Sequence, residues 1–172
     1  RANGIVTLIE DMKCTQLLLL PSQLSQLLLH QQSSSVALER CIVSGEVLST
    51  TVLHKFIAKY PTTQIMNLYG QTETTGDCLW ADLTELGENA VVANVVAVGG
   101  PIAQTKVAFL GDTADGQQGD IRREQQLVIQ GSQLSNGYLG SSSSFVEFVP
   151  GDVGFCQNGI WYVRGRVDDV HK

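Results

Sequence analysis

The sequence has few basic residues and no long apolar run. Lys and Arg together number 11 against 17 Asp and Glu, and the formal net charge is −6. A nucleic-acid backbone or an anionic membrane attracts clustered Lys and Arg, so this balance argues against both as partners. No apolar run approaches the roughly 20 residues that cross a bilayer, so we expect no membrane span.

Cysteine is scarce and scattered. Cys14, Cys41, Cys78 and Cys156 include no C-x-x-C pair, which argues against zinc ligation. Isolated cysteines are typical of small buried side chains that stay reduced, so we expect a cytoplasmic location. The chain begins RANGIVTLIED, which is not a signal peptide and lacks an initiator Met. A piece of a longer protein is therefore expected.

The common phosphate-binding and catalytic motifs are also missing. There is no G-x-x-x-x-G-K-[ST] loop and no G-x-G-x-x-G after a strand. H-E-x-x-H and G-x-S-x-G are absent as well. The three histidines, His30, His54 and His171, lie in unrelated contexts. These absences disfavour an ordinary dehydrogenase-type nucleotide domain, which needs a glycine fingerprint.

The first hundred residues alternate between two apolar periods. Short solid apolar runs that are typical of buried strands lie at 15–20, 40–45 and 63–70. Helical patterns precede or separate them: one over 5–12, one with Ser22 as its N-cap, and one capped by Ser49. This alternation predicts an α/β fold in which a parallel sheet is covered by helices.

The rest of the chain is typical of antiparallel β structure. Short apolar runs split by glycine lie at 106–110, 126–131 and 160–166. They predict a small β-barrel-like subdomain after the parallel sheet. We place the boundary so that 1–98 is the α/β part and 99–163 the β-rich subdomain. The serines at 141–144 are expected to form a loop.

Polar residues gather where the third expected strand ends, in NLYGQTETTGD at 67–77. Ligands of parallel sheets bind beyond the carboxyl ends of the strands, so this loop is a candidate binding site. The same residues are also compatible with a helix start, with Thr72 as N-cap and Glu73 in the first turn. This stretch taken alone leaves both interpretations open.

Six segments follow one another in an order that matches a known pattern. They are SGEVLS at 44–49, NLYGQTE at 67–73, GGPI at 99–102, QLVIQGSQLSNGYLG at 126–140, PGD at 150–152 and GRVDDVHK at 165–172. This order resembles the adenylate-forming superfamily of acyl-CoA synthetases, luciferases and peptide-synthetase adenylation domains. Within it, SGEVLS, YGQTETTGDC and SNGYLG most resemble β-alanine-activating enzymes related to aminoadipate-semialdehyde dehydrogenase.

The resemblance implies a site for ATP and Mg²⁺. Tyr69 would lie against the adenine, and Gly70 would let the backbone approach the nucleotide. As catalytic residues, Thr72 would offer its hydroxyl to a phosphate and Glu73 would hold Mg²⁺. Asp152 would accept both ribose hydroxyls. The other implied nucleotide-binding residues are Gly45 and Glu46, mostly through backbone, with Asn67, Arg166 and Lys172.

The resemblance also implies a substrate pocket and a hinge. Ser44 and Asp77 would line the pocket, and Asp77 would meet a substrate ammonium, with a loop-capping role as its alternative. Asp168 would be the hinge residue of a hinge segment over 164–172. Two departures stand out: the superfamily more often has Gly in place of Ser44, and VP stands before Gly-Asp where a Thr is usual.

The implied reaction activates a small carboxylic or amino acid as an adenylate. The acyl or aminoacyl group would then pass to the thiol of coenzyme A or of a carrier-protein phosphopantetheine. The superfamily's phosphate loop and catalytic Lys have no counterpart in the sequence, so we expect a central-to-hinge fragment that is inactive alone. The alternative is a non-catalytic remnant or truncated isoform that keeps a nucleotide site or acts as an interaction module.

Overall fold

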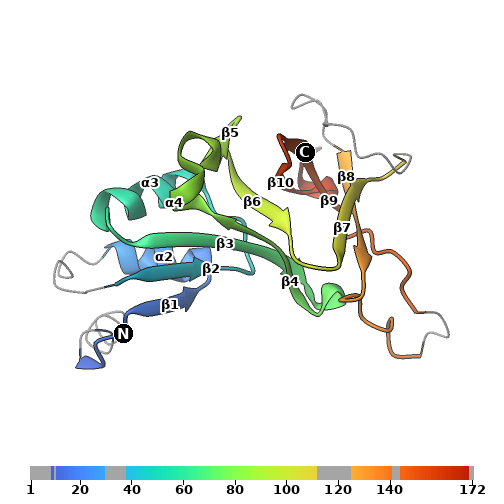
Figure 1. Ribbon diagram of the computed structural model, residues 1–172, viewed down its shortest axis with the longest axis horizontal. Coiled ribbons are helices and arrows are strands. Elements are labelled where there is room, and N and C mark those ends of the chain that lie inside the picture. Colours follow the sequence, from blue (N-terminus) through green and yellow to red (C-terminus); the bar gives the residue numbers. More distant parts are fainter. Residues whose placement is uncertain (1–8, 10, 30–37, 112–124, 141–143, 171–172) are drawn as a thin grey trace.

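The computed structural model describes residues 9, 11–29, 38–111, 125–140 and 144–170. Figure 1 shows two lobes joined by long strands, with most of the helical structure on the lobe that begins the chain. Three expectations lie wholly or mostly outside the described residues: the helix over 5–12, the serine loop at 141–144 and the role of Lys172.

The first lobe is a parallel sheet covered by helices, which confirms the α/β prediction. Strands β1, β2 and β3 run parallel, with Leu18 opposite Ile42 and Ile42 opposite Met66. Leu24 of α2 and Phe56 of α3 are fully buried in the core of this lobe. The bounds are β1 Gln16–Leu19, α2 Pro21–Leu29, β2 Arg40–Val43, α3 Thr50–Lys59 and β3 Gln64–Gln71.

One of the two expected helix caps forms. The hydroxyl of Ser49 accepts the N–H of Val52 at 3.3 Å and caps α3. Helix α2 instead begins at Pro21, so Ser22 lies inside its first turn. The N–H and hydroxyl of Ser22 each donate to the Glu46 carboxylate at 2.9 Å. The N-cap prediction for Ser22 is wrong, because a carboxylate from another loop satisfies this helix start.

After β3 the chain turns back through β4 into the first lobe, where α4 and η2 contribute to its core, and β6 then leads to the second lobe. Strand β4 runs antiparallel to β3, and β6 runs antiparallel to β4. The remaining elements are η1 Thr72–Thr74, β4 Gly76–Asp82, α4 Leu83–Leu86, η2 Gly87–Ala90, β5 Val91–Val92, β6 Val95–Pro101, β7 Thr105–Phe109, β8 Gln125–Gly131, β9 Asp152–Gln157, β10 Ile160–Arg166 and α5 Val167–Val170.

The expected barrel is not closed. The described strands form one sheet in the order β1-β2-β3-β4-β6-β10-β9-β8-β7, with β5 paired to β6, and β7 pairs only with β8 (Figure 1). Strand β6 pairs with β4 at Gly100 and Pro101, and with β10 at Ala97 and Gly99. Because both edges of β6 are taken, none remains to which β7 could pair and close a barrel.

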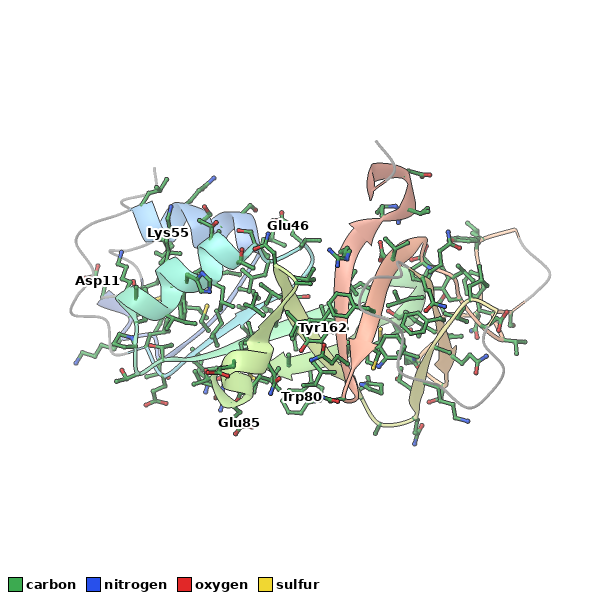
Figure 2. The ribbon with its side chains drawn as sticks, turned by 90° about the horizontal axis from the view of Figure 1, so that it is seen from above. Asp11, Glu46, Lys55, Trp80, Glu85 and Tyr162 are labelled. Carbon is green, nitrogen blue, oxygen red and sulfur yellow. The ribbon has the colours of Figure 1, made fainter. Side chains whose placement is uncertain are left out.

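Strand β6 also contributes to both apolar cores. Val96 and Ala97 belong to the core of the first lobe, and Val98 belongs to the core of the second. Tyr162 of β10 also lies in the first core, where its ring stacks on Phe155 at 4.7 Å, and Figure 2 shows it between the lobes. The predicted boundary between the α/β part and the β-rich subdomain, near residue 98, therefore lies inside β6. The division of the chain at this point stays a prediction.

Two further expectations concern membranes and cysteines. Within the described ranges, no helix combines the length and the apolar character that spanning a bilayer requires. All four cysteines are free thiols. Burial raises the pKa of the Cys41 thiol to about 12 and that of Cys78 to about 11, so both stay protonated at neutral pH.

Gly99 is predicted to be intolerant of any side chain. Its φ is +82°, and a Cβ would come 1.8 Å from the carbonyl oxygen of Trp80. Gly159 has φ +79° but open space around it, which makes it a matched control. We expect G99A to lower the free energy of unfolding by about 3 kcal/mol or more, and G159A by only about 1 kcal/mol. Urea unfolding followed by circular dichroism measures both, and equal losses would contradict the prediction.

Candidate functional site

A cavity of about 310 Å³ opens where the ends of several strands meet. Its volume lies at the lower end of the range of small-molecule sites. It is lined by Gly45, Glu46, Val47, Leu48, Asn67, Leu68, Tyr69, Gly70, Gln71, Val96, Val98, Asp152, Val163, Gly165 and Arg166. The loop after β2 and the second half of β3 supply one side, and β6, β9 and β10 supply the other.

Tyr69 and Asp152 meet inside this cavity although they are 83 positions apart. The phenol donates to Oδ2 of Asp152 at 2.6 Å, and Nε2 of Gln71 donates to the same oxygen at 2.8 Å. Burial raises the pKa of Tyr69, and the charge and hydrogen bond of Asp152 raise it further. The phenol therefore stays protonated at neutral pH and holds the carboxylate in place.

Glycine at position 70 has a structural reason of its own. A Cβ there would come 2.0 Å from the carbonyl oxygen of Gly76, on the returning strand β4. Close packing of the β3–β4 turn thus requires glycine before any ligand is considered. Gly70 also lines the cavity, so the room that it leaves is available to a ligand as well.

Gly45 and Glu46 form part of the cavity wall, and the Glu46 side chain is hydrogen-bonded to another element. Both residues line the cavity. The Glu46 carboxylate is held by the first turn of α2 through Ser22 (Figure 2). Gly45 has φ +85°, a conformation that favours glycine. What this loop offers a ligand is therefore mainly its backbone.

Asn67 ties the two sides of the cavity together. Its side chain is 3% exposed, and its amide donates to the carbonyl oxygen of Ala97 at 2.9 Å. This bond joins the end of β3 to β6. The side chain is thus a scaffold of the cavity wall.

Thr72 and Glu73 follow directly after Gln71 in the short helix η1, beside the cavity. The buried Thr74 hydroxyl accepts the N–H of Gln71 at 2.9 Å and holds the turn. The N-cap of η1 is Gln71, so the alternative reading of Thr72 as N-cap is wrong. Glu73 does lie in the first turn, where it is half-buried.

Ser44 and Asp77 come together, although neither borders the cavity itself. The Ser44 hydroxyl donates to Oδ1 of Asp77 at 2.6 Å. Ser44 directly precedes the wall residue Gly45, and Asp77 faces Gly70 across the β3–β4 pair. The two residues therefore form a polar pair next to the cavity, and Asp77 is exposed.

Arg166 stands opposite Asp152 at the end of β10. It lines the cavity, and its Nη1 donates to the carbonyl oxygen of Pro150 at 3.0 Å. Asp168 lies two residues later in α5, where it is exposed and does not line the cavity. Its role as a hinge stays a prediction, and Lys172 lies outside the described residues.

The residues present fit a nucleotide with its metal. No cluster of three or more His, Cys, Asp or Glu side chains that could hold a metal ion is found within the described ranges. Mg²⁺ is commonly held by one or two carboxylates together with substrate phosphates and water, and Glu73 supplies one carboxylate. Tyr69 supplies an aromatic face and Asp152 a fixed carboxylate, groups that suit a base and a sugar diol.

No sequence pattern pointed to several of the residues that line the cavity. Gln71 orients Asp152, yet in the sequence it is only the variable position of the Y-G-x-T-E pattern. Val96, Val98 and Val163 give the cavity its apolar surface. The run VVAV in β6 is apolar throughout, so no sequence pattern shows which of its side chains face a cavity.

The fold is that of adenylation domains. An O-succinylbenzoate CoA synthetase from Bacillus subtilis, solved with its acyl-adenylate intermediate, gives a TM-score of 0.76 at 18% identity, over 98% of this chain and 34% of that chain. McyG A-PCP complexed with phenylalanyl-adenylate gives 0.75 at 18% identity, over 95% and 32%. At these identities the likeness concerns the fold alone.

The family follows from the sequence comparison. A model described as AMP-binding enzyme matches residues 2–139, and the chain belongs to this family. A D-alanine–D-alanyl carrier protein ligase of Bacillus cereus (strain AH187) is 31% identical over 138 residues, which cover 72% of this chain and 26% of that protein. The chain thus spans about a quarter of the length of the curated relatives it matches. Its resemblance to the adenylate-forming superfamily is confirmed.

Tyr69 is predicted to make the protein less stable in alkali. Its pKa is raised in the folded state, so the unfolded chain loses the phenol proton first. Its contribution is complete below the ordinary tyrosine pKa of about 10 and is lost as pH rises from there toward the folded value. Above about pH 10, the free energy of unfolding should fall less steeply with pH in Y69F than in the wild type, and the two slopes should differ by up to about 1.4 kcal/mol per pH unit. Urea unfolding across this range tests this, and equal slopes would contradict it.

Proposed function

We propose that this chain is the central part of an ATP-dependent ligase that activates a carboxylate as its adenylate, for transfer to a thiol. The observation that carries the proposal is the meeting of Tyr69 and Asp152 at 2.6 Å in a cavity that Gly45 and Arg166 also line. Membership of the AMP-binding family supports the same conclusion and makes the dehydrogenase alternative wrong.

In this proposal the cavity holds the adenosine of ATP. The ring of Tyr69 and the nearby valines offer flat and apolar surface to adenine. Asp152, fixed through Oδ2 by Tyr69 and Gln71, accepts the ribose hydroxyls. Arg166 borders the same space with a permanent positive charge, which suits the ribose or a phosphate.

The phosphates then lie toward η1. The substrate carboxylate attacks the α-phosphorus of ATP, the bond to the bridging oxygen breaks, and pyrophosphate leaves with the electron pair. When bound, Mg²⁺ would offset the negative charge on the phosphates. Glu73 would hold that ion, and the hydroxyl of Thr72 would donate to a phosphate oxygen. Both are placed by a turn that Thr74 locks.

For the acid that is activated, an amino acid is the class best supported. Ser44 fixes Oδ1 of Asp77 beside the cavity, and a fixed carboxylate suits an ammonium group. A relative is named for D-alanine and its carrier protein, and one solved neighbour contains phenylalanyl-adenylate. Another neighbour is a CoA synthetase, so coenzyme A and a carrier-protein phosphopantetheine both stay open as acceptors. Activation of β-alanine and a cytoplasmic location stay predictions.

A second candidate is a nucleotide-binding protein without turnover. Among the described residues that line the cavity, Arg166 is the only cation. The chain also spans only 26% of the length of its relative. Two anions must be brought together in adenylation, which calls for more positive charge than one arginine supplies. Robust pyrophosphate release from ATP with amino or carboxylic acids by these 172 residues would exclude this second candidate and would also contradict the expected inactivity of the chain alone. Mg²⁺-dependent ATP binding that is lost in E73Q would favour the first candidate.

We expect the ATP affinity of the chain to depend on Mg²⁺ through Glu73. Isothermal titration of ATP in excess MgCl₂ and in EDTA gives two dissociation constants. The constant in EDTA divided by the constant in MgCl₂ is the Mg²⁺ ratio, and it should fall to near one in E73Q. D152N should weaken binding of AMP about tenfold or more, because a charge-assisted contact is lost. Glu85 in α4, which does not line the cavity and is marked in Figure 2, gives the control E85Q. AMP binding unaltered in D152N would contradict the assignment.

Asp77 is predicted to select an amino group on the substrate. The probes are an aminoacyl sulfamoyl-adenosine and the matching analogue without the amino group, which mimic the two adenylates. D77N should reduce the preference for the amino analogue by about twofold to fivefold, the range expected for an exposed ion pair. D11N replaces another exposed aspartate that does not line the cavity, and it should leave the preference unchanged. A preference unaltered in D77N would show that Asp77 only caps its loop.

A further inference from the structure

The carboxylate of Glu73 is held by a second segment of the chain. The hydroxyl of Tyr138 donates to Oε1 of Glu73 at 2.7 Å, across 65 positions of sequence. The N–H of Ser135 donates to the carbonyl oxygen of Glu73 at 2.8 Å. The loop after β8 therefore grips both the side chain and the backbone of the same residue of η1.

Tyr138 is itself held in place by aromatic packing. Its ring meets Phe145 edge-on at 5.4 Å, and Phe145 packs against Phe148 at 5.6 Å. Phe148 is buried, and its backbone exchanges two hydrogen bonds of 2.8 Å with Ile129 of β8. An unbroken series of rings thus connects the Glu73 carboxylate to the sheet of the second lobe.

This arrangement exceeds what folding of an exposed loop requires. Tyr138 is 60% exposed, and a phenol on such a loop gains little stability from one bond to a half-buried acid. A carboxylate on a three-residue turn can rotate, whereas a hard cation with strict geometry favours a fixed ligand. The phenol restrains the carboxylate through Oε1 alone and does not use Oε2.

We propose that Tyr138 is a positioning residue that orients the Glu73 carboxylate for the divalent cation accompanying ATP. The proposal rests on the proposed function and adds to it a contribution from the second lobe. Partners that orient a metal-binding carboxylate typically change metal affinity by 10–100-fold, and an exposed partner falls below that range.

The test compares ATP affinity in excess MgCl₂ and in EDTA by isothermal titration of the full 172-residue chain. The ratio of the two dissociation constants should fall about threefold to tenfold in Y138F, with affinity in EDTA unchanged. F145L keeps the phenol but removes the edge contact, so it should lower the ratio by less. Tyr162 donates to the carbonyl oxygen of Asn89 at 2.7 Å within the first lobe, so Y162F is the matched control and should keep the ratio.

A double variant tests whether Tyr138 affects Mg²⁺-dependent binding through Glu73. In an E73Q background, adding Y138F should not lower the ratio further, since the group that it orients is gone. A Mg²⁺ ratio unaltered or raised in Y138F would overturn the positioning role, and a raised ratio would mean that the phenol competes with the cation. If the wild-type chain binds ATP equally well in MgCl₂ and EDTA, the metal role of Glu73 fails and this inference falls with it.

Discussion

The cavity depends on one constraint, the sharing of β6 between two halves of the sheet. Its backbone pairs with β4 on one side and β10 on the other, and its side chains enter both cores. This sharing fixes the distance between the second half of β3 on one side and the start of β9 and the end of β10 on the other. Gly99 makes the crossing possible, because the carbonyl of Trp80 occupies the space of a side chain. Without that close approach of β6 to β4, the two halves of the sheet would not hold Tyr69 and Asp152 in contact.

Hydrogen bonds to neighbouring residues fix several polar side chains of the cavity. Asp152 is held by Tyr69 and Gln71, Asn67 is bonded to β6, and Glu46 is committed to α2. A ligand therefore meets groups that are already oriented, which lowers the entropy lost on binding. Such preorganisation suits the proposed formation of an adenylate, in which two anionic reactants are brought together.

The sequence was most informative where the chain obeys local periodicity. The three parallel strands and the Ser49 cap follow from apolar period and capping chemistry, both of which act within a few residues. The antiparallel pairing of the later strands was predicted as well, but these strands do not close into a barrel. Closure depends on which edges of β6 are free, and no local pattern encodes that. Motif order pointed to Tyr69 and Asp152, which the structure brings into contact. The hydrogen bond from Tyr138 to Glu73 joins two loops far apart in the sequence, and no motif indicates it.

The open sheet also leaves β1 as a terminal strand with β2 as its single described neighbour. Leu18 and Leu20 of this region are 68% and 40% exposed, and no charged side chain lies between Gln16 and Leu20. Unprotected strands of this composition recruit further strands from other molecules. At high concentration, self-association of the isolated chain would therefore begin at β1, on the side of the molecule away from the second lobe (Figure 1).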